Sequence, residues 1–86
     1  MVYEIKYSDK AKKELLKLDK SVALRIHKFL IERVAQNPKN IGGFLQGNLA
    51  GFWRYRVGDF RIITEIENDI LTVLVLKIAH RKDVYE

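Results

Sequence analysis

The sequence has 86 residues, of which 48% are hydrophobic and none is cysteine, so it favours one folded domain over residues 1–86 and excludes disulfide bonds and thiolate metal sites. No apolar run approaches the roughly 20 residues of a membrane-spanning helix, and we expect a cytoplasmic protein. The net charge of +5 arises in residues 1–44, where ten Lys and Arg face five Asp and Glu. Such an excess suits a polyanion or an acidic protein partner, and equally a merely soluble domain.

The N-terminal half predicts one strand followed by two helices. Met1–Tyr7 alternates apolar and polar residues, which is the pattern of a strand. Ser8 or Asp9 can cap a first helix, whose apolar residues are Ala11, Leu15, Leu16 and Leu18. Residues 19–21 predict a short break before a second helix, whose apolar face consists of Val22, Ile26, Phe29, Leu30 and Val34. Asn37-Pro38 ends this helix, because proline has no amide to donate.

The C-terminal half predicts three strands after a connector at residues 37–51 that is rich in Gly and Asn. The strands are Phe52–Val57, Phe60–Glu67 and Ile70–Ala79. Gly58-Asp59 and Asn68-Asp69 predict the short turns between them, since these residues tolerate positive φ. His80–Glu86 is a polar tail. The predicted fold is α+β in the order β-α-α-β-β-β, a small single domain with a helical hairpin packed on a mainly antiparallel sheet.

Three arginines stand among aromatic residues in the stretch FWRYRVGDFRII. Alternation puts Trp53, Tyr55 and Val57 on the face toward the helices and Arg54 and Arg56 on the opposite face. A two-residue turn then places Arg56 opposite Arg61. Like charges in such a pair destabilise a sheet by up to ~1 kcal/mol, unless Asp59, Glu65 or an anion relieves the repulsion. The pattern therefore favours a negatively charged ligand.

The C-terminal AHRKDVYE brings His80, Arg81 and Tyr85 just beyond a central strand, where they could join the three arginines of the hairpin. This combination of groups suits phosphodiester chemistry on RNA. Guanidinium groups bind phosphate oxygens in pairs, and a phenol ring can stack on an exposed base. RNA carries its own nucleophile, the 2′-hydroxyl, so we expect neither a metal nor a cofactor.

An LxG before the first hairpin strand, the WRYRVGDFRII hairpin and the terminal HRKDVY together resemble the RelE/ParE toxin superfamily over nearly the whole chain. The HRxxVY ending favours the RelE branch. The resemblance implies a toxin of a type II toxin–antitoxin pair that enters the ribosomal A site and cleaves mRNA. In that reaction the 2′-hydroxyl attacks the adjacent phosphate and leaves a 2′,3′-cyclic phosphate and a 5′-hydroxyl. It also implies a cognate antitoxin that wraps the toxin and inactivates it.

The resemblance implies six catalytic residues, which are Arg54, Arg56, Arg61, Arg81, His80 and Tyr85. Arg54 and Arg56 fall where well-known members carry lysines, whereas Arg61 and Arg81 match phosphate-binding arginines of the family. Because arginine does not readily release a proton, Arg54 and Arg56 are expected to bind phosphate rather than act as bases. Proton transfer would then fall to His80, to Tyr85 or to a ribosomal group.

Other interpretations stay open at this level. Arg54 and Arg56 could be solvated strand residues, Arg61 could pair with Asp59, and Tyr85 could pack the tail against the sheet. The lysines of the first helix form either a solvated face or a contact with antitoxin or ribosomal RNA; they are Lys10, Lys12, Lys13 and Lys17. Two other functions share the fold: a ParE-like toxin that inhibits DNA gyrase without being an enzyme, and a non-toxic RNA- or protein-binding domain.

Overall fold

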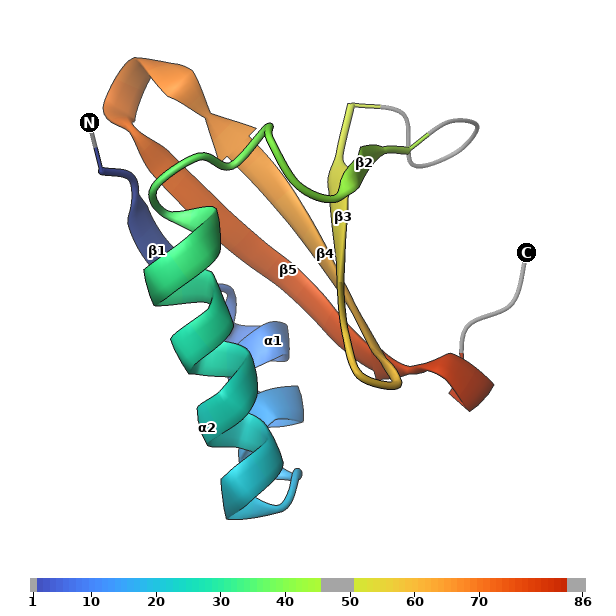
Figure 1. Ribbon diagram of the computed structural model, residues 1–86. Coiled ribbons are helices and arrows are strands. Elements are labelled where there is room, and N and C mark those ends of the chain that lie inside the picture. Colours follow the sequence, from blue (N-terminus) through green and yellow to red (C-terminus); the bar gives the residue numbers. More distant parts are fainter. Residues whose placement is uncertain (1, 46–50, 84–86) are drawn as a thin grey trace.

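The computed structural model describes residues 2–45 and 51–83 of the chain, in which one five-stranded sheet lies against a pair of helices (Figure 1). The elements in chain order are β1 (Glu4–Tyr7), α1 (Asp9–Leu16), α2 (Lys20–Phe29), β2 (Gly43–Phe44), β3 (Trp53–Val57), β4 (Phe60–Glu67) and β5 (Thr72–His80). The spatial order of the strands is β1-β5-β4-β3-β2. β1 runs parallel to β5, and every other neighbouring pair is antiparallel. The predicted α+β fold with a mainly antiparallel sheet is confirmed.

The helices begin where capping residues were predicted. The Oγ of Ser8 accepts a hydrogen bond of 3.1 Å from the amide of Ala11, which satisfies one free donor of the first turn of α1. Asp19 is the N-cap residue of α2, although its side chain accepts no such bond. α2 continues as a π-helical segment, Leu30–Val34, which closes with a bond of 2.8 Å from the amide of Ala35 to the carbonyl of Leu30.

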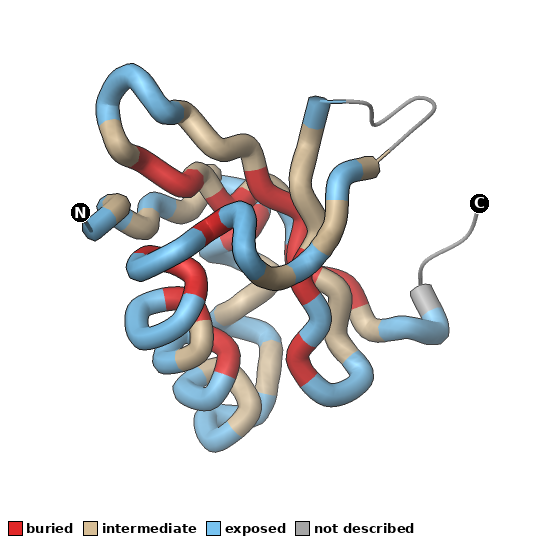
Figure 2. The backbone as a smooth tube through the Cα atoms, turned by 45° about the horizontal axis from the view of Figure 1, so that its top comes forward, coloured by how far each residue is buried: buried red, intermediate tan, exposed pale blue. Residues whose placement is uncertain are grey.

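The core lies between the helices and one face of the sheet (Figure 2). Its most deeply buried members come from α1, α2, the π-helical segment and strands β3 to β5, and include Ala11, Ile26, Leu30, Tyr55, Ile62, Val73 and Val75. The Tyr55 hydroxyl donates to the carbonyl of Pro38, and the Trp53 indole donates to that of Ile41 at 2.7 Å. These bonds tie the connector to β3, as expected of structural aromatic residues.

The connector contributes β2, a strand that the sequence did not predict. β2 pairs with β3 so that Gly43 lies opposite Arg54. The preceding Gly42 has a φ of 75°, and a side chain there would clash with the backbone oxygen of Arg54 and with the indole of Trp53. Only glycine allows this approach without strain. The residues Gln46 and Gly47, which carry part of the LxG pattern, lie outside the described residues.

The connection between β4 and β5 differs from the prediction. Asn68–Ile70 forms a 3₁₀ turn, and Leu71 rather than Asn68 or Asp69 takes a positive φ, of 49°. β5 therefore starts at Thr72 instead of Ile70 and runs one residue further than predicted, to His80. The apolar run misled the prediction because Ile70 is apolar yet 63% exposed.

A bulge lies in the middle of β5. Ile63 pairs with Lys77 while the next residue, Thr64, pairs with Val75, so that Leu76 has no partner in β4. One extra residue reverses which face the following side chains take. As a result Val75 and Ile78 both face the helices, although they are three residues apart.

The end of β5 is bordered by α1 rather than by another strand. β1 pairs with β5 only as far as Val75. Beyond that point the Ser8 hydroxyl donates to the carbonyl of Leu76 at 3.2 Å, and the amide of Ile78 donates to a carboxylate oxygen of Glu14 at 2.7 Å.

Within residues 2–45 and 51–83, the helices lack the length and apolar character needed to cross a membrane.

Candidate functional site

Helices α1 and α2 lie on one face of the sheet and leave the other uncovered (Figure 1). Arg54 and Arg56 alternate with the buried Tyr55 and Val57 along β3, and therefore lie on the uncovered face. The register of the hairpin of β3 and β4 is the predicted one, with Val57 opposite Phe60 and Arg56 opposite Arg61. Gly58 has a φ of 58° at the first position of the two-residue turn, a conformation that glycine adopts without strain. In the part of the chain that the structure describes, neither Arg56 nor Arg61 forms an ion pair with a carboxylate. Their mutual repulsion is therefore not relieved by a protein partner there.

Arg81 joins this hairpin from the end of β5. It opens a 3₁₀ turn, Arg81–Asp83, and its amide donates a hydrogen bond of 2.7 Å to the carbonyl of Asp59. Its guanidinium lies 3.6 Å from the Asp59 carboxylate. The two side chains are 75% and 62% exposed, so this ion pair adds little to stability. It does hold the Arg81 side chain beside the hairpin turn.

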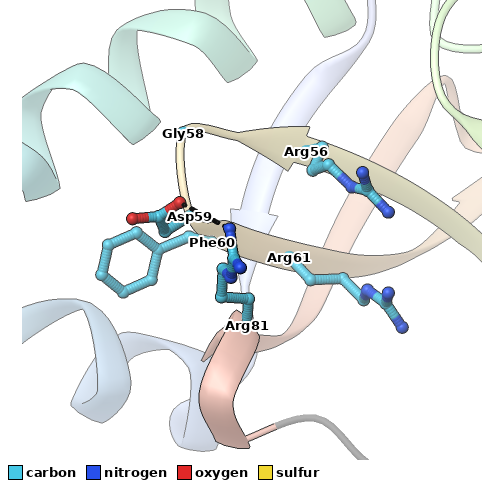
Figure 3. Close-up of a pocket in the computed structure, with 6 residues that line it drawn as sticks. All are labelled: Arg56, Gly58, Asp59, Phe60, Arg61 and Arg81. Atoms are coloured by element: carbon cyan, nitrogen blue, oxygen red, sulfur yellow. Dashed lines mark ion pairs between the residues drawn. The ribbon is translucent and has the colours of Figure 1, made fainter.

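The three arginines line one hollow of about 240 Å³ (Figure 3). Its wall consists of Arg56, Gly58, Asp59, Phe60, Arg61 and Arg81. We call it the arginine hollow. It is smaller than the roughly 300–1,000 Å³ of a typical small-molecule pocket. Three guanidinium groups around so small a space suit a phosphate group, which they can bind with paired, charge-assisted hydrogen bonds.

Arg54 lies on the same face but does not line the arginine hollow. Its guanidinium lies over Gly43 of β2, where a Cβ atom would be only 3.4 Å from Nη2. The glycine thus leaves room for the arginine to lie along the edge of the sheet. Arg54 can extend the positive surface away from Arg56, along β3.

Lys77 is a cation of this face that sequence reasoning missed. It pairs with Ile63, which in turn pairs with Arg54, and residues directly opposite each other share a face. The side chain is exposed. Simple alternation from Val73 and Val75 would turn Lys77 toward the helices, and only the bulge reverses it. The one available signal was its position as the sole charged residue in ILTVLVLKIA.

His80 is not brought to the arginine hollow. It pairs with Phe60, and the two rings meet edge to face with centroids 5.2 Å apart. This pair belongs to the other face of the sheet from Arg56 and Arg61. The Nδ1 atom of His80 accepts a hydrogen bond of 3.1 Å from the amide of Lys82. A neutral His80 therefore carries its proton on Nε2, where it can donate but not accept.

The remaining predicted site residue, Tyr85, lies outside the described residues. Over residues 2–45 and 51–83, no group of three or more acidic or histidine side chains is arranged to hold a metal ion. The guanidinium groups of the arginine hollow can bind a phosphate and stabilise added negative charge on it.

Comparison with known proteins points to one family. Residues 5–85 match the model of a family described as the ParE toxin of type II toxin–antitoxin systems, parDE. The curated protein Toxin RelG from Mycobacterium tuberculosis is 28% identical over 85 residues, which cover 99% of this chain and 98% of that protein.

Two solved toxin–antitoxin complexes are similar in structure. The RelBE2 complex from Mycobacterium tuberculosis has a TM-score of 0.89 with 26% identity and covers 94% of this chain and 100% of its own. The archaeal RelE–RelB complex from Pyrococcus horikoshii has a TM-score of 0.68 with 26% identity and covers 98% and 100%. The chain belongs to the ParE toxin family of type II toxin–antitoxin systems, within the RelE/ParE toxin superfamily.

Proposed function

We propose that this toxin is a metal-independent endoribonuclease that cleaves mRNA in the ribosomal A site. The observation that carries the proposal is that Arg56, Arg61 and Arg81, from three separate segments, line one hollow that is large enough for a phosphate group. Arg56 and Arg61 lie directly opposite each other, and such a pair of like charges destabilises the sheet unless an anion binds between them. The similarity to a curated protein named Toxin RelG supports the RelE branch of the superfamily.

In the proposed reaction the 2′-oxygen of one nucleotide attacks the adjacent phosphorus as its proton departs. The new P–O2′ bond forms while the P–O5′ bond breaks and the leaving oxygen takes up a proton, which gives a 2′,3′-cyclic phosphate and a 5′-hydroxyl. Arg56, Arg61 and Arg81 would bind the non-bridging oxygens and stabilise the extra charge of the pentacoordinate phosphorus. Arg54 would bind a flanking phosphate.

Proton transfer is assigned to groups other than the arginines, since these stay protonated. His80 would donate a hydrogen bond through Nε2, with its Nδ1 held by the Lys82 amide, from the edge of the site rather than inside the hollow. To transfer a proton, it would first have to give up the bond from the Lys82 amide, because an imidazole that exchanges a proton through Nε2 carries a proton on Nδ1. Tyr85 would stack on or orient the RNA. A ribosomal group would complete the proton transfers, which accounts for a dependence on the ribosome.

The proposed protein partner is an antitoxin encoded with the toxin. The RelBE2 and Pyrococcus horikoshii structures are complexes of relatives with such proteins. The lysines of the first helical stretch, Lys10, Lys12, Lys13 and Lys17, are all exposed and would meet acidic antitoxin residues or ribosomal RNA.

A second candidate function is supported by the matching family description, which names ParE. A ParE-like toxin would inhibit DNA gyrase by binding it, without cleaving RNA. The two functions are separated by inducing the toxin in cells and measuring both mRNA ends and gyrase-linked DNA breaks. We expect new mRNA ends, no increase in DNA breaks, and loss of growth inhibition in Arg61→Ala and Arg81→Ala. DNA breaks with intact mRNA would replace the nuclease with the gyrase inhibitor.

A further inference from the structure

A second hollow lies on the other side of the hairpin turn. It measures about 230 Å³ and is lined by Val22, Arg25, Val57, Gly58, Asp59 and Phe60. We call it the α2 hollow, because Val22 and Arg25 belong to that helix. It shares Gly58, Asp59 and Phe60 with the arginine hollow. The two hollows therefore adjoin, and only the tip of the hairpin separates them.

Arg25 lies over that tip. Its Nη1 atom is 3.3 Å from the point that a Cβ atom of Gly58 would occupy. Glycine at the turn thus allows the guanidinium to come close to the backbone of the hairpin. Within residues 2–45 and 51–83 Arg25 forms no ion pair, although Asp59 lines the same hollow; the Asp59 carboxylate pairs with Arg81 instead. The guanidinium is available to an external anion.

Besides Arg25, the lining of the α2 hollow combines three apolar side chains with Gly58 and the Asp59 carboxylate. Val22, Val57 and Phe60 form its wall, and Phe60 and Val22 are half-buried rather than covered. An apolar surface next to one guanidinium fits a nucleotide, whose base or ribose can lie against the wall while its phosphate binds the cation. A free anion such as sulfate has no apolar part that could pack against this wall.

We propose that the RNA strand crosses the hairpin at Gly58, with its scissile phosphate in the arginine hollow and a neighbouring nucleotide in the α2 hollow, where Arg25 binds its phosphate. This inference rests on the proposed nuclease function and adds a residue from the helical layer to the RNA path. It makes Arg25 a binding residue for the flanking nucleotide, not a group that touches the reacting atoms. No motif in the sequence assigned a role to Arg25.

The test measures single-turnover cleavage of ribosome-bound mRNA by the full chain at subsaturating toxin. Arg25→Ala is expected to lower the rate at least tenfold, which corresponds to about 1.4 kcal/mol. Lys28→Ala is the matched control: it removes an exposed cation one turn further along α2 that lines neither hollow. Its rate should stay within about twofold of wild type, as for other exposed sites.

The partner of Arg25 is identified by removing charge from the RNA instead of the protein. Messages carry a neutral methylphosphonate one position to the 5′ or the 3′ side of the scissile phosphate. Wild type should slow at least tenfold on one of these two messages. Arg25→Ala should cleave that same message no more slowly than the natural one, because residue and phosphate form a coupled pair.

The possible results distinguish a failure of the proposed nuclease function from a failure of the inference about Arg25. If wild type leaves the message intact, the proposed function fails and the inference with it. If wild type cleaves and Arg25→Ala matches Lys28→Ala, only the inference is overturned. It is equally overturned if Arg25→Ala is slow but keeps full sensitivity to both methylphosphonates, since Arg25 then acts through the ribosome or the fold. The response of wild type to the two messages tests the path without relying on any variant.

Discussion

Arg56 and Arg61 are cross-strand neighbours of like charge, an arrangement that opposes folding and favours anion binding at the same place. Functional sites commonly retain such local conflicts because the ligand, not the fold, resolves them. Substituting one of these two arginines should therefore affect folding stability and anion binding in opposite directions. A change that helps stability should harm function.

We predict that Arg61→Gln raises the free energy of unfolding by a few tenths to about 1 kcal/mol, because it removes the repulsion. The same change should reduce RNA cleavage about 10- to 150-fold, as expected for a lost charge-assisted hydrogen bond of about 1.5–3 kcal/mol. Urea denaturation at low salt and a cleavage assay give the two numbers.

Lys77→Gln is the control for that experiment. It removes a cation from the same face, but one whose partner across the strand is Ile63 rather than another cation. Its stability should change little. If Arg61→Gln instead destabilises the protein while Lys77→Gln does not, Arg61 has a structural role, and the interpretation of the pair as a ligand site is wrong.

At the scale of elements, α1 does more than cover the core. The carboxylate of Glu14 accepts from the amide of Ile78 on the part of β5 that β1 does not reach. An amide left without an acceptor in this half-buried place costs free energy, so the helix replaces a missing strand neighbour. This bond lies two residues before His80 and three before Arg81.

We predict that Glu14→Ala lowers the free energy of unfolding by about 1–3 kcal/mol, because the Ile78 amide loses its acceptor. Glu14→Gln keeps an acceptor oxygen and should cost less than half as much. Amide hydrogen exchange at Ile78 should accelerate in the alanine variant and stay protected in the glutamine variant. Equal stabilities of the two variants would indicate that the bond contributes nothing.

The bulge at Leu76 explains where sequence prediction succeeded and where it failed. Arg56 opposite Arg61 could be predicted, because a two-residue turn fixes the register of a hairpin. Lys77 and His80 could not, because uninterrupted alternation along β5 would give each of them the opposite face. Pairing between strands, which decides the position of the bulge, is not encoded in the periodicity of one strand.

Short elements were missed for a related reason. β2 has only two residues, Gly43 and Phe44, so it has no period to recognise. The preceding Gly42 leaves no room for a side chain against the backbone of β3, a contact across the sheet that the sequence of one segment does not reveal. Helices, the longer strands and the fold class followed from their repeated apolar patterns.

For the molecule as a whole, the buried Tyr55 and the half-buried Tyr7 predict how stability depends on pH. Burial raises the pKa of Tyr7 to about 12 and raises the pKa of Tyr55 further, against an ordinary value of 10.0. In Tyr55 the effect of burial outweighs the opposing effect of the nearby Thr64 hydroxyl. The unfolded chain releases these phenol protons near pH 10, while the folded chain keeps them. The contribution of these two groups to the free energy of unfolding is therefore fully present below pH 10 and declines as the pH rises from 10 toward 12.

We predict that Tyr7→Phe reduces the decline of the free energy of unfolding between pH 10 and pH 12, since phenylalanine has no proton to release. Urea denaturation of wild type and variant over this range measures the difference. At lower pH the variant should be the less stable of the two, because it loses the hydrogen bond of 2.8 Å between Tyr7 and Nδ1 of His27. If the free energy of unfolding declined equally in the two proteins between pH 10 and pH 12, the raised pKa of Tyr7 would be contradicted.

The molecule thus divides into a helical layer that buries the core and a sheet face with arginines at one end. The central claim is that this face binds and cleaves mRNA on the ribosome. Primer extension on a reporter mRNA in a reconstituted translation system, with wild type beside Arg81→Ala, tests it most directly. We predict cuts at A-site codons that require ribosomes and disappear in the variant while its fold is retained. An intact message with folded wild-type toxin would contradict the claim and leave gyrase as the target to examine.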